Sequence, residues 1–174
     1  MRLSLCIILL FVAESLIAQR YKSEEGSITF FSDASIEDIT ATNTKAISIF
    51  DVSSGEVAFL VTINDFDFDK SLMKEHFNEK YMESDKYPKA TFKGRIMDYD
   101  SKVKGDQEVT AKGELTIHGQ TKSINVTGVI SFNDNRITMD SSFMVELEDF
   151  NVKIPKLLWQ NIAERVEVTI KFIY

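Results

Sequence analysis

Cysteine is almost absent from this 174-residue sequence, because the one cysteine, Cys6, lies in the apolar beginning of the chain. If that beginning is removed on export, no thiol remains, which excludes disulfides, thiol nucleophiles and cysteine-based metal sites. The chain also has two prolines and no Pro/Gly-rich linker or internal repeat. It is long enough for one domain, beginning at about residue 20, that depends on its hydrophobic core for stability.

Positively charged residues are also fewer than negatively charged ones. The sequence has 20 Lys and Arg against 27 Asp and Glu, which gives a formal net charge of −7. A polyanion such as nucleic acid is repelled by such a surface unless a local basic cluster overrides it. No such cluster occurs in the sequence, so we predict no nucleic-acid partner.

The first eighteen residues have the three-part pattern of a secretory signal peptide. Arg2 gives a positive start, Leu3–Val12 is an apolar run of about ten residues, and Ala18 offers a small residue at the end. That run is too short to cross a bilayer. We therefore predict a signal peptide at 1–18, a domain at 19–174, a periplasmic or secreted location, and no transmembrane segment in the mature chain.

Alternation of apolar and polar residues dominates the remainder. Between Val109 and Ile117 the apolar positions are every second residue, as expected for half-buried antiparallel strands. The other strands expected from the sequence are Ser27–Phe31, Ala46–Asp51, Glu56–Ile63, Ala90–Asp98, Ser123–Phe132, Arg136–Leu147 and Val166–Phe172. About eight strands suffice for a closed barrel that encloses side chains or one small ligand.

Two segments read as helices. Asp69–Met82 changes to helical spacing, and Pro155–Ala163 is a second, shorter candidate that begins with proline. The predicted fold class is therefore mainly β, an extended antiparallel barrel of about eight strands with one or two short helices.

The apolar face of the strands carries several small residues, which leaves two interpretations open. Ala90, Gly94, Ala111, Gly113 and Gly128 would leave room for a ligand if this face points inward, or they mark places where the sheet bends. Aromatic residues make up 11% of the sequence, and they serve equally as the wall of an apolar cavity or as core filler.

Signals for catalysis are weak. Ser71 and Lys74 match a Ser-x-x-Lys pattern, but its usual companion motifs are missing. The two histidines, His76 and His118, have no neighbouring set of metal ligands, and we interpret both as structural or surface residues. We predict that the protein is not an enzyme and has no catalytic residues and no metal site.

Two stretches resemble the signatures of one known family. His76–Phe92 is similar to a segment in which a helix leads into a "KYP-x-A-x-F" strand, and Gly113–Lys122 is similar to a "G-x-L-T-I-H-G-x-T-K" hairpin. Asp149–Val152 resembles a shorter "D-F-G-I" element in which Asn151 replaces the usual glycine. Together these segments resemble the YceI-like family of lipocalin-like periplasmic proteins that bind polyisoprenoids.

The resemblance implies a lipocalin-like barrel, exported to the periplasm, that holds an apolar or amphiphilic lipid. No cofactor is required, and a polyisoprenoid or quinone-like lipid is the expected ligand. The residues that we expect to line its cavity are Phe59, Phe68, Met73, Phe77, Tyr81, Phe92, Leu115, Phe143, Leu158 and Trp159. The signature residues themselves, such as His118 and Pro88, are interpreted as architectural.

Three alternatives remain open at this stage. The main one is a non-catalytic barrel whose core is filled by its own side chains and whose surface binds another protein. A weaker one is an enzyme acting on a bound lipid through His76, His118 or Ser71. A homodimer is an alternative to a monomer in each case.

Overall fold

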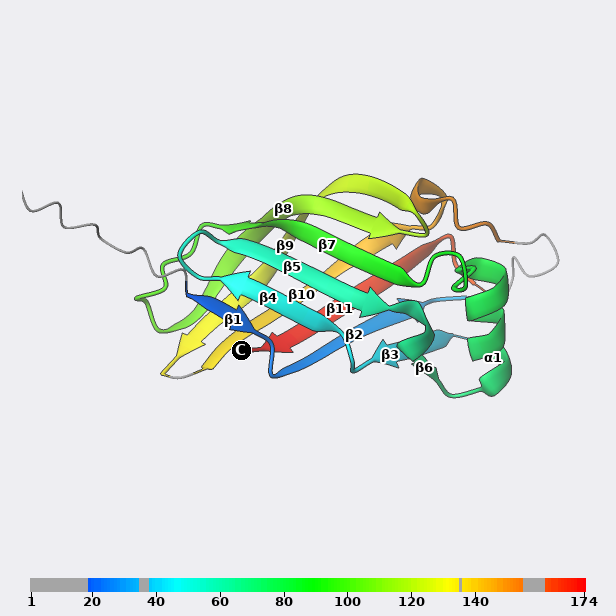
Figure 1. Ribbon diagram of the computed structural model, residues 1–174, viewed down its shortest axis with the longest axis horizontal. Helices are drawn as coiled ribbons and strands as arrows, with labels where there is room; N and C mark the ends of the chain where they lie inside the picture. Colours follow the sequence, from blue (N-terminus) through cyan, green and yellow to red (C-terminus); the bar gives the residue numbers. More distant parts are fainter. Residues whose placement is uncertain (1–18, 35–37, 135, 155–161) are drawn as a thin grey trace, which may run out of the picture.

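The computed structural model describes residues 19–34, 38–134, 136–154 and 162–174, and most of these residues belong to one curled antiparallel sheet (Figure 1). The sheet has eleven strands in the order β1-β4-β5-β7-β8-β9-β10-β11-β2-β3-β6. Their bounds are β1 Arg20–Lys22, β2 Glu25–Ser32, β3 Ile39–Asn43, β4 Ile47–Asp51, β5 Glu56–Thr62, β6 Asp67–Phe68, β7 Lys89–Met97, β8 Gly105–Ile117, β9 Gln120–Asn133, β10 Arg136–Glu146 and β11 Arg165–Ile173.

Three pairs of these strands are consecutive parts of one longer strand. β1 and β2 form one interrupted strand, and β3 and β4 form another. Arg20 of β1 is paired with Asp51 of β4, and Ser32 of β2 is paired with Ile39 of β3, in the same register. The two interrupted strands therefore form a single hairpin. The 3-10 turn η1, Ile63–Asp65, and Phe66 separate β5 from β6. Eleven strands therefore amount to eight long ones, which confirms the predicted barrel of about eight strands.

The same pairing brings the ends of the sheet together. β2 pairs with β11 on one side and with β3 on the other, while β4, the continuation of β3, pairs with β5. The long strands thus follow one another around the barrel, with β7, β8, β9 and β10 completing the circuit. Such closure covers sheet edges that would otherwise be free to pair with other chains.

A short helical segment lies at one end of the barrel, which we call the helix end (Figure 1). The α-helix α1 covers Ser71–His76, and the π-helical turn η2 covers Phe77–Tyr81, so the expected helix at Asp69–Met82 is shorter and changes its hydrogen-bonding pattern halfway. α1 buries no residue, whereas η2 buries Phe77 and Tyr81. The helix predicted at Pro155–Ala163 lies mostly outside the described residues.

Aromatic side chains close the helix end of the barrel. The ring of Phe77 lies with its centroid 5.3 Å from that of Phe30, 5.6 Å from Phe66 and 5.0 Å from Phe68. Rings at these separations attract one another beyond the gain from burial alone. The π-helical turn is thereby held against the strands.

A second aromatic group closes the opposite end, which we call the far end. Phe50 is fully buried, with its ring centroid 5.8 Å from Tyr99 and 6.0 Å from Tyr174. The Tyr99 hydroxyl donates a hydrogen bond of 2.6 Å to the Val52 carbonyl, and the oxygens of Tyr174 and Ser48 lie 2.5 Å apart. Burial raises the pKa of the Tyr174 phenol, so this hydroxyl remains neutral.

The structure also answers what the small residues of the inner face do. Gly94 and Gly113 are paired across β7 and β8, and the tip of the Phe92 ring would lie 2.7 Å from a Cβ atom at either position. A backbone carbonyl oxygen of the neighbouring strand would lie closer still, at 2.4 Å, so these glycines allow the close approach of β7 and β8 as well as of the Phe92 ring. Ala90, Ala111 and Gly128 instead line an internal cavity, as the first interpretation expects. Bending of the sheet at the glycines stays a prediction.

Candidate functional site

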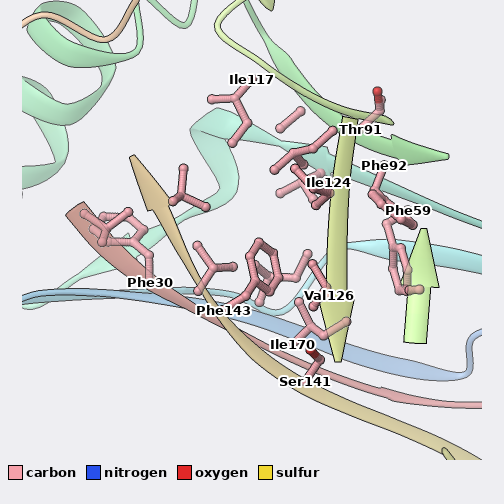
Figure 2. A pocket seen from close by; sticks show the side chains of 18 of the residues that line it. Phe30, Phe59, Thr91, Phe92, Ile117, Ile124, Val126, Ser141, Phe143 and Ile170 are labelled. Carbon is pink, nitrogen blue, oxygen red and sulfur yellow. The ribbon is translucent and has the colours of Figure 1, made fainter. Parts of the chain in front are cut away.

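A cavity of about 200 Å³ lies inside the barrel between the two aromatic groups. Strands β2, β5, β7, β8, β9, β10 and β11 all contribute to its wall, together with η2 and the segment after β10. In Figure 2, side chains such as Phe143, Val126 and Ile170 project from different strands into this common space. The alternation of the strands explains the wall, because every second residue points inward.

The wall is almost entirely hydrocarbon. Its polar side chains are Tyr81, Thr91, Thr127, Asp140 and Ser141. Burial raises the pKa of the Tyr81 phenol, so that hydroxyl stays uncharged. Asp140 is the only charged residue of the described wall, and it is exposed to solvent. The interior therefore offers dispersion contacts and water exclusion, which suit an apolar ligand.

Six of the ten residues expected in the cavity wall lie there: Phe59, Phe77, Tyr81, Phe92, Leu115 and Phe143. Phe68 is not among the wall residues, and its ring packs against those of Phe30 and Phe77, with centroids 5.8 Å and 5.0 Å away. Met73 sits on α1, which covers the outside of the helix end, and is also not part of the wall. Leu158 and Trp159 lie outside the described residues. Contact of any of these residues with a ligand remains a prediction.

Several wall residues were not selected from the sequence. Phe30, Ile124, Val126 and Ile170 are visible in Figure 2 among the side chains that border the cavity. All four lie on the apolar face of an alternating strand, so the pattern that predicted the strands also contained this information. The residues expected in the wall are mostly aromatic, whereas aliphatic residues supply much of it.

His118, from the second signature, joins three segments at the helix end. Its Nδ1 lies 3.2 Å from the Phe150 carbonyl oxygen, and its Nε2 lies 2.9 Å from a carboxylate oxygen of Glu83. The ring is buried and meets the Tyr87 ring edge-on at 4.4 Å. His118 itself is not part of the described cavity wall. These contacts support the architectural interpretation of this residue.

Two signature positions, Gly119 and Asn151, have a backbone conformation with positive φ. Gly119 has a φ of +73°, and a Cβ there would lie 2.6 Å from the Tyr87 ring. Asn151 has a φ of +53°, a left-handed conformation in which asparagine is the most readily tolerated substitute for glycine. The departure from the usual glycine in this element therefore keeps its geometry.

Replacing His118 by alanine is expected to lower the melting temperature by about 4–8 °C. The change removes two hydrogen bonds and a ring contact, together worth about 2 kcal/mol, and a domain of this size loses about 2–4 °C per kcal/mol. Thermal unfolding followed by circular dichroism measures the effect. His76→Ala, on α1, is the control and should change stability by less than about 0.5 kcal/mol. Equal melting temperatures for the two variants would contradict the role given to His118.

The remaining candidates for chemistry do not gather at the cavity. Ser71 is exposed at the start of α1, and the Nζ atom of Lys74 lies 3.1 Å from a carboxylate oxygen of Asp67. Within the described ranges, no group of three or more His, Cys, Asp or Glu residues could hold a metal ion. None of the helices in the described part of the chain has the length and apolar character needed to cross a membrane.

The architecture defines a class: an antiparallel barrel of eight long strands that encloses an apolar cavity. The sequence pattern of the YceI-like domain matches residues 19–174, the whole of the barrel. This chain therefore belongs to the YceI-like domain family.

Solved structures share the fold at low sequence identity. BcnA of Burkholderia cenocepacia is 18% identical, with a TM-score of 0.73 over 86% of this chain and 96% of that one. A polyisoprenoid-binding domain from Saccharophagus degradans, implicated in plant cell wall breakdown, is 15% identical, with a TM-score of 0.75 over 88% and 96%. The YceI protein of Campylobacter jejuni is 14% identical, with a TM-score of 0.59 over 100% and 92%. No curated protein sequence matches this chain significantly.

Proposed function

We propose that this protein is an exported, non-enzymatic binding protein that sequesters or carries an isoprenoid or other amphiphilic lipid in its barrel. The observation that carries the proposal is the apolar cavity of about 200 Å³ inside the barrel. Family membership and the similarity to a polyisoprenoid-binding domain support it. The signal-like pattern of residues 1–18 supports export to the periplasm or beyond.

The size of the cavity limits what it can hold. An engineered cavity of about 150 Å³ in another protein binds benzene, so a space of this volume takes a ring or a short stretch of chain. Each 100 Å² of apolar ligand surface removed from water contributes about 2.5 kcal/mol, less the cost of immobilising the ligand. A long isoprenoid therefore either displaces wall side chains or extends beyond the cavity.

Uptake of a fluorescent lipophilic probe tests the proposal. The protein, prepared without detergent, is titrated with an anilinonaphthalene dye, and farnesol is then added as a competitor. We expect saturable binding at one site and displacement of the dye by farnesol. Failure of the folded protein to take up the dye, farnesol or longer isoprenoids would contradict lipid binding.

The alternative is a barrel with a filled core whose surface binds another protein; the cavity counts against the filled core, but one observation favours a binding surface. Ile47 and Ile49 point outward from β4 and are 39% and 48% exposed, next to their pairing partners Leu60 and Ala58 on β5. Apolar patches of this kind often mark protein interfaces, including those of homodimers. Sedimentation of the wild-type protein and of Ile49→Lys distinguishes this alternative, because a self-associating surface would give a larger species that the lysine abolishes.

A further inference from the structure

The wall of the barrel has a gap between β9 and β10. Backbone pairing between these strands begins where Arg136 is opposite Asn133 and ends where Asp140 is opposite Val129. β9 nevertheless extends back to Gln120, and β10 continues to Glu146. On their other sides both strands stay paired, β9 with β8 as far as Gln120 and β10 with β11 as far as Glu146. Residues 120–128 and 141–146, all within the described part of the chain, thus face each other without a ladder.

Side chains bridge the gap at its two ends. At the inner end, the Ser141 hydroxyl donates a hydrogen bond of 2.6 Å to the Thr127 carbonyl. At the helix end, Lys122 Nζ lies 3.3 Å from a carboxylate oxygen of Asp149, which belongs to the turn after β10. The gap is therefore a bounded opening rather than a frayed edge.

The cavity reaches the surface at this place. Of the described residues that line the cavity, only Thr127, Val129 and Asp140 are exposed to solvent, and all three lie where the β9–β10 pairing ends. At the helix end the lining residues Phe77, Tyr81 and Phe150 are 9%, 7% and 3% exposed. The far end is closed by the group around Phe50.

The unpaired segments on either side of the gap, residues 120–128 and 141–146, are called its lips, and they combine polar and apolar side chains. Asn125 and Thr127 point outward from β9, and Ser142 and Met144 point outward from β10, with Met144 48% exposed. The Ser142 hydroxyl donates to a Glu167 carboxylate oxygen at 2.5 Å. The backbone groups of residues 120–128 and 141–146 do not form a β ladder with one another. Such a border suits the point at which an apolar chain ends and its polar end group meets water.

We infer that the lipid enters through the gap between β9 and β10, and that its polar end emerges there rather than at either end of the barrel. This inference rests on the proposed function. It also accounts for the small cavity, since a chain longer than the enclosed space leaves through the side wall.

The inference is tested by labelling single cysteines with a maleimide that carries a long alkyl chain, which should bind in the cavity. In a Cys6→Ser background, Asn125→Cys and Met144→Cys place a thiol on each lip. Leu72→Cys on α1 and Val103→Cys in the far-end loop are the matched controls, with wild-type side chains 58% and 50% exposed. Each variant is reacted with hexadecyl maleimide and with N-ethylmaleimide, and the ratio of the two rates removes differences in thiol reactivity.

We expect this ratio to be at least about tenfold higher at positions 125 and 144 than at 72 and 103, because a bound chain holds its maleimide at a high local concentration. Excess farnesol should abolish the difference. A highest ratio at position 72 or 103, or equal ratios at all four positions in a protein that binds the dye, would overturn the inference. Absence of dye and farnesol binding would instead remove the proposed function on which the inference rests.

Discussion

Replacing Ala111 by phenylalanine is expected to weaken the binding of a long-chain lipid by about 60-fold. Ala111 lines the cavity from the middle of β8, between Ile96 on β7 and Val126 on β9. A phenyl ring at this position would occupy space that the ligand needs. Losing about 100 Å² of apolar ligand contact costs about 2.5 kcal/mol, which corresponds to that change in the dissociation constant.

The outer face of the same strand supplies the control for this substitution. Lys112 follows Ala111 and is exposed, so Lys112→Phe adds the same ring outside the barrel. Dye displacement by farnesol should give the wild-type dissociation constant for Lys112→Phe and a much weaker one for Ala111→Phe. Both variants should remain folded, because the ring in Ala111→Phe fills existing space. Undiminished binding by a folded Ala111→Phe would show that the lipid does not occupy this cavity.

Replacing Phe77 by alanine is expected to destabilise the protein by about 3–5 kcal/mol, the usual cost of removing a buried phenylalanine ring. Phe77 is 9% exposed and contacts the rings of Phe30, Phe66 and Phe68 at the helix end. For a domain of this size the melting temperature should fall by about 6–20 °C. Thermal unfolding followed by circular dichroism measures the change.

Leu72→Ala is the control for this prediction. Leu72 lies on α1, close in sequence to Phe77, but its side chain is 58% exposed. Its loss should shift the free energy of unfolding by no more than about 0.5 kcal/mol. If Phe77→Ala and Leu72→Ala melt within a degree of each other, the aromatic group does not hold the helical segment on the barrel.

The barrel could be predicted from the sequence because its strands are locally encoded. Alternation in segments such as Val109–Ile117 fixed both the strand and its inward face, and eight such segments gave the number of long strands. The interruptions could not be foreseen. β3, Ile39–Asn43, contains three polar residues in five positions and is too short for its pattern to indicate a strand, yet it pairs in register with β2.

The cavity wall was predictable only in part, for two physical reasons. Phe68 has the size and apolar character of a wall residue, but it packs against the Phe30 ring at the helix end and does not line the cavity. The gap between β9 and β10 leaves no trace in either strand, since both keep their alternation through the unpaired region. Pairing between distant segments depends on tertiary geometry that local pattern does not contain.

Native mass spectrometry of the protein, purified from its exported form without detergent, is the most direct test of lipid binding. We expect a defined mass increment that is lost on solvent extraction and recovered as an isoprenoid or other amphiphilic lipid in the organic phase. If the preparation is ligand-free, added quinones and isoprenoids should produce the increment at one per chain. A folded protein that carries no lipid and acquires none from these additions would contradict the account.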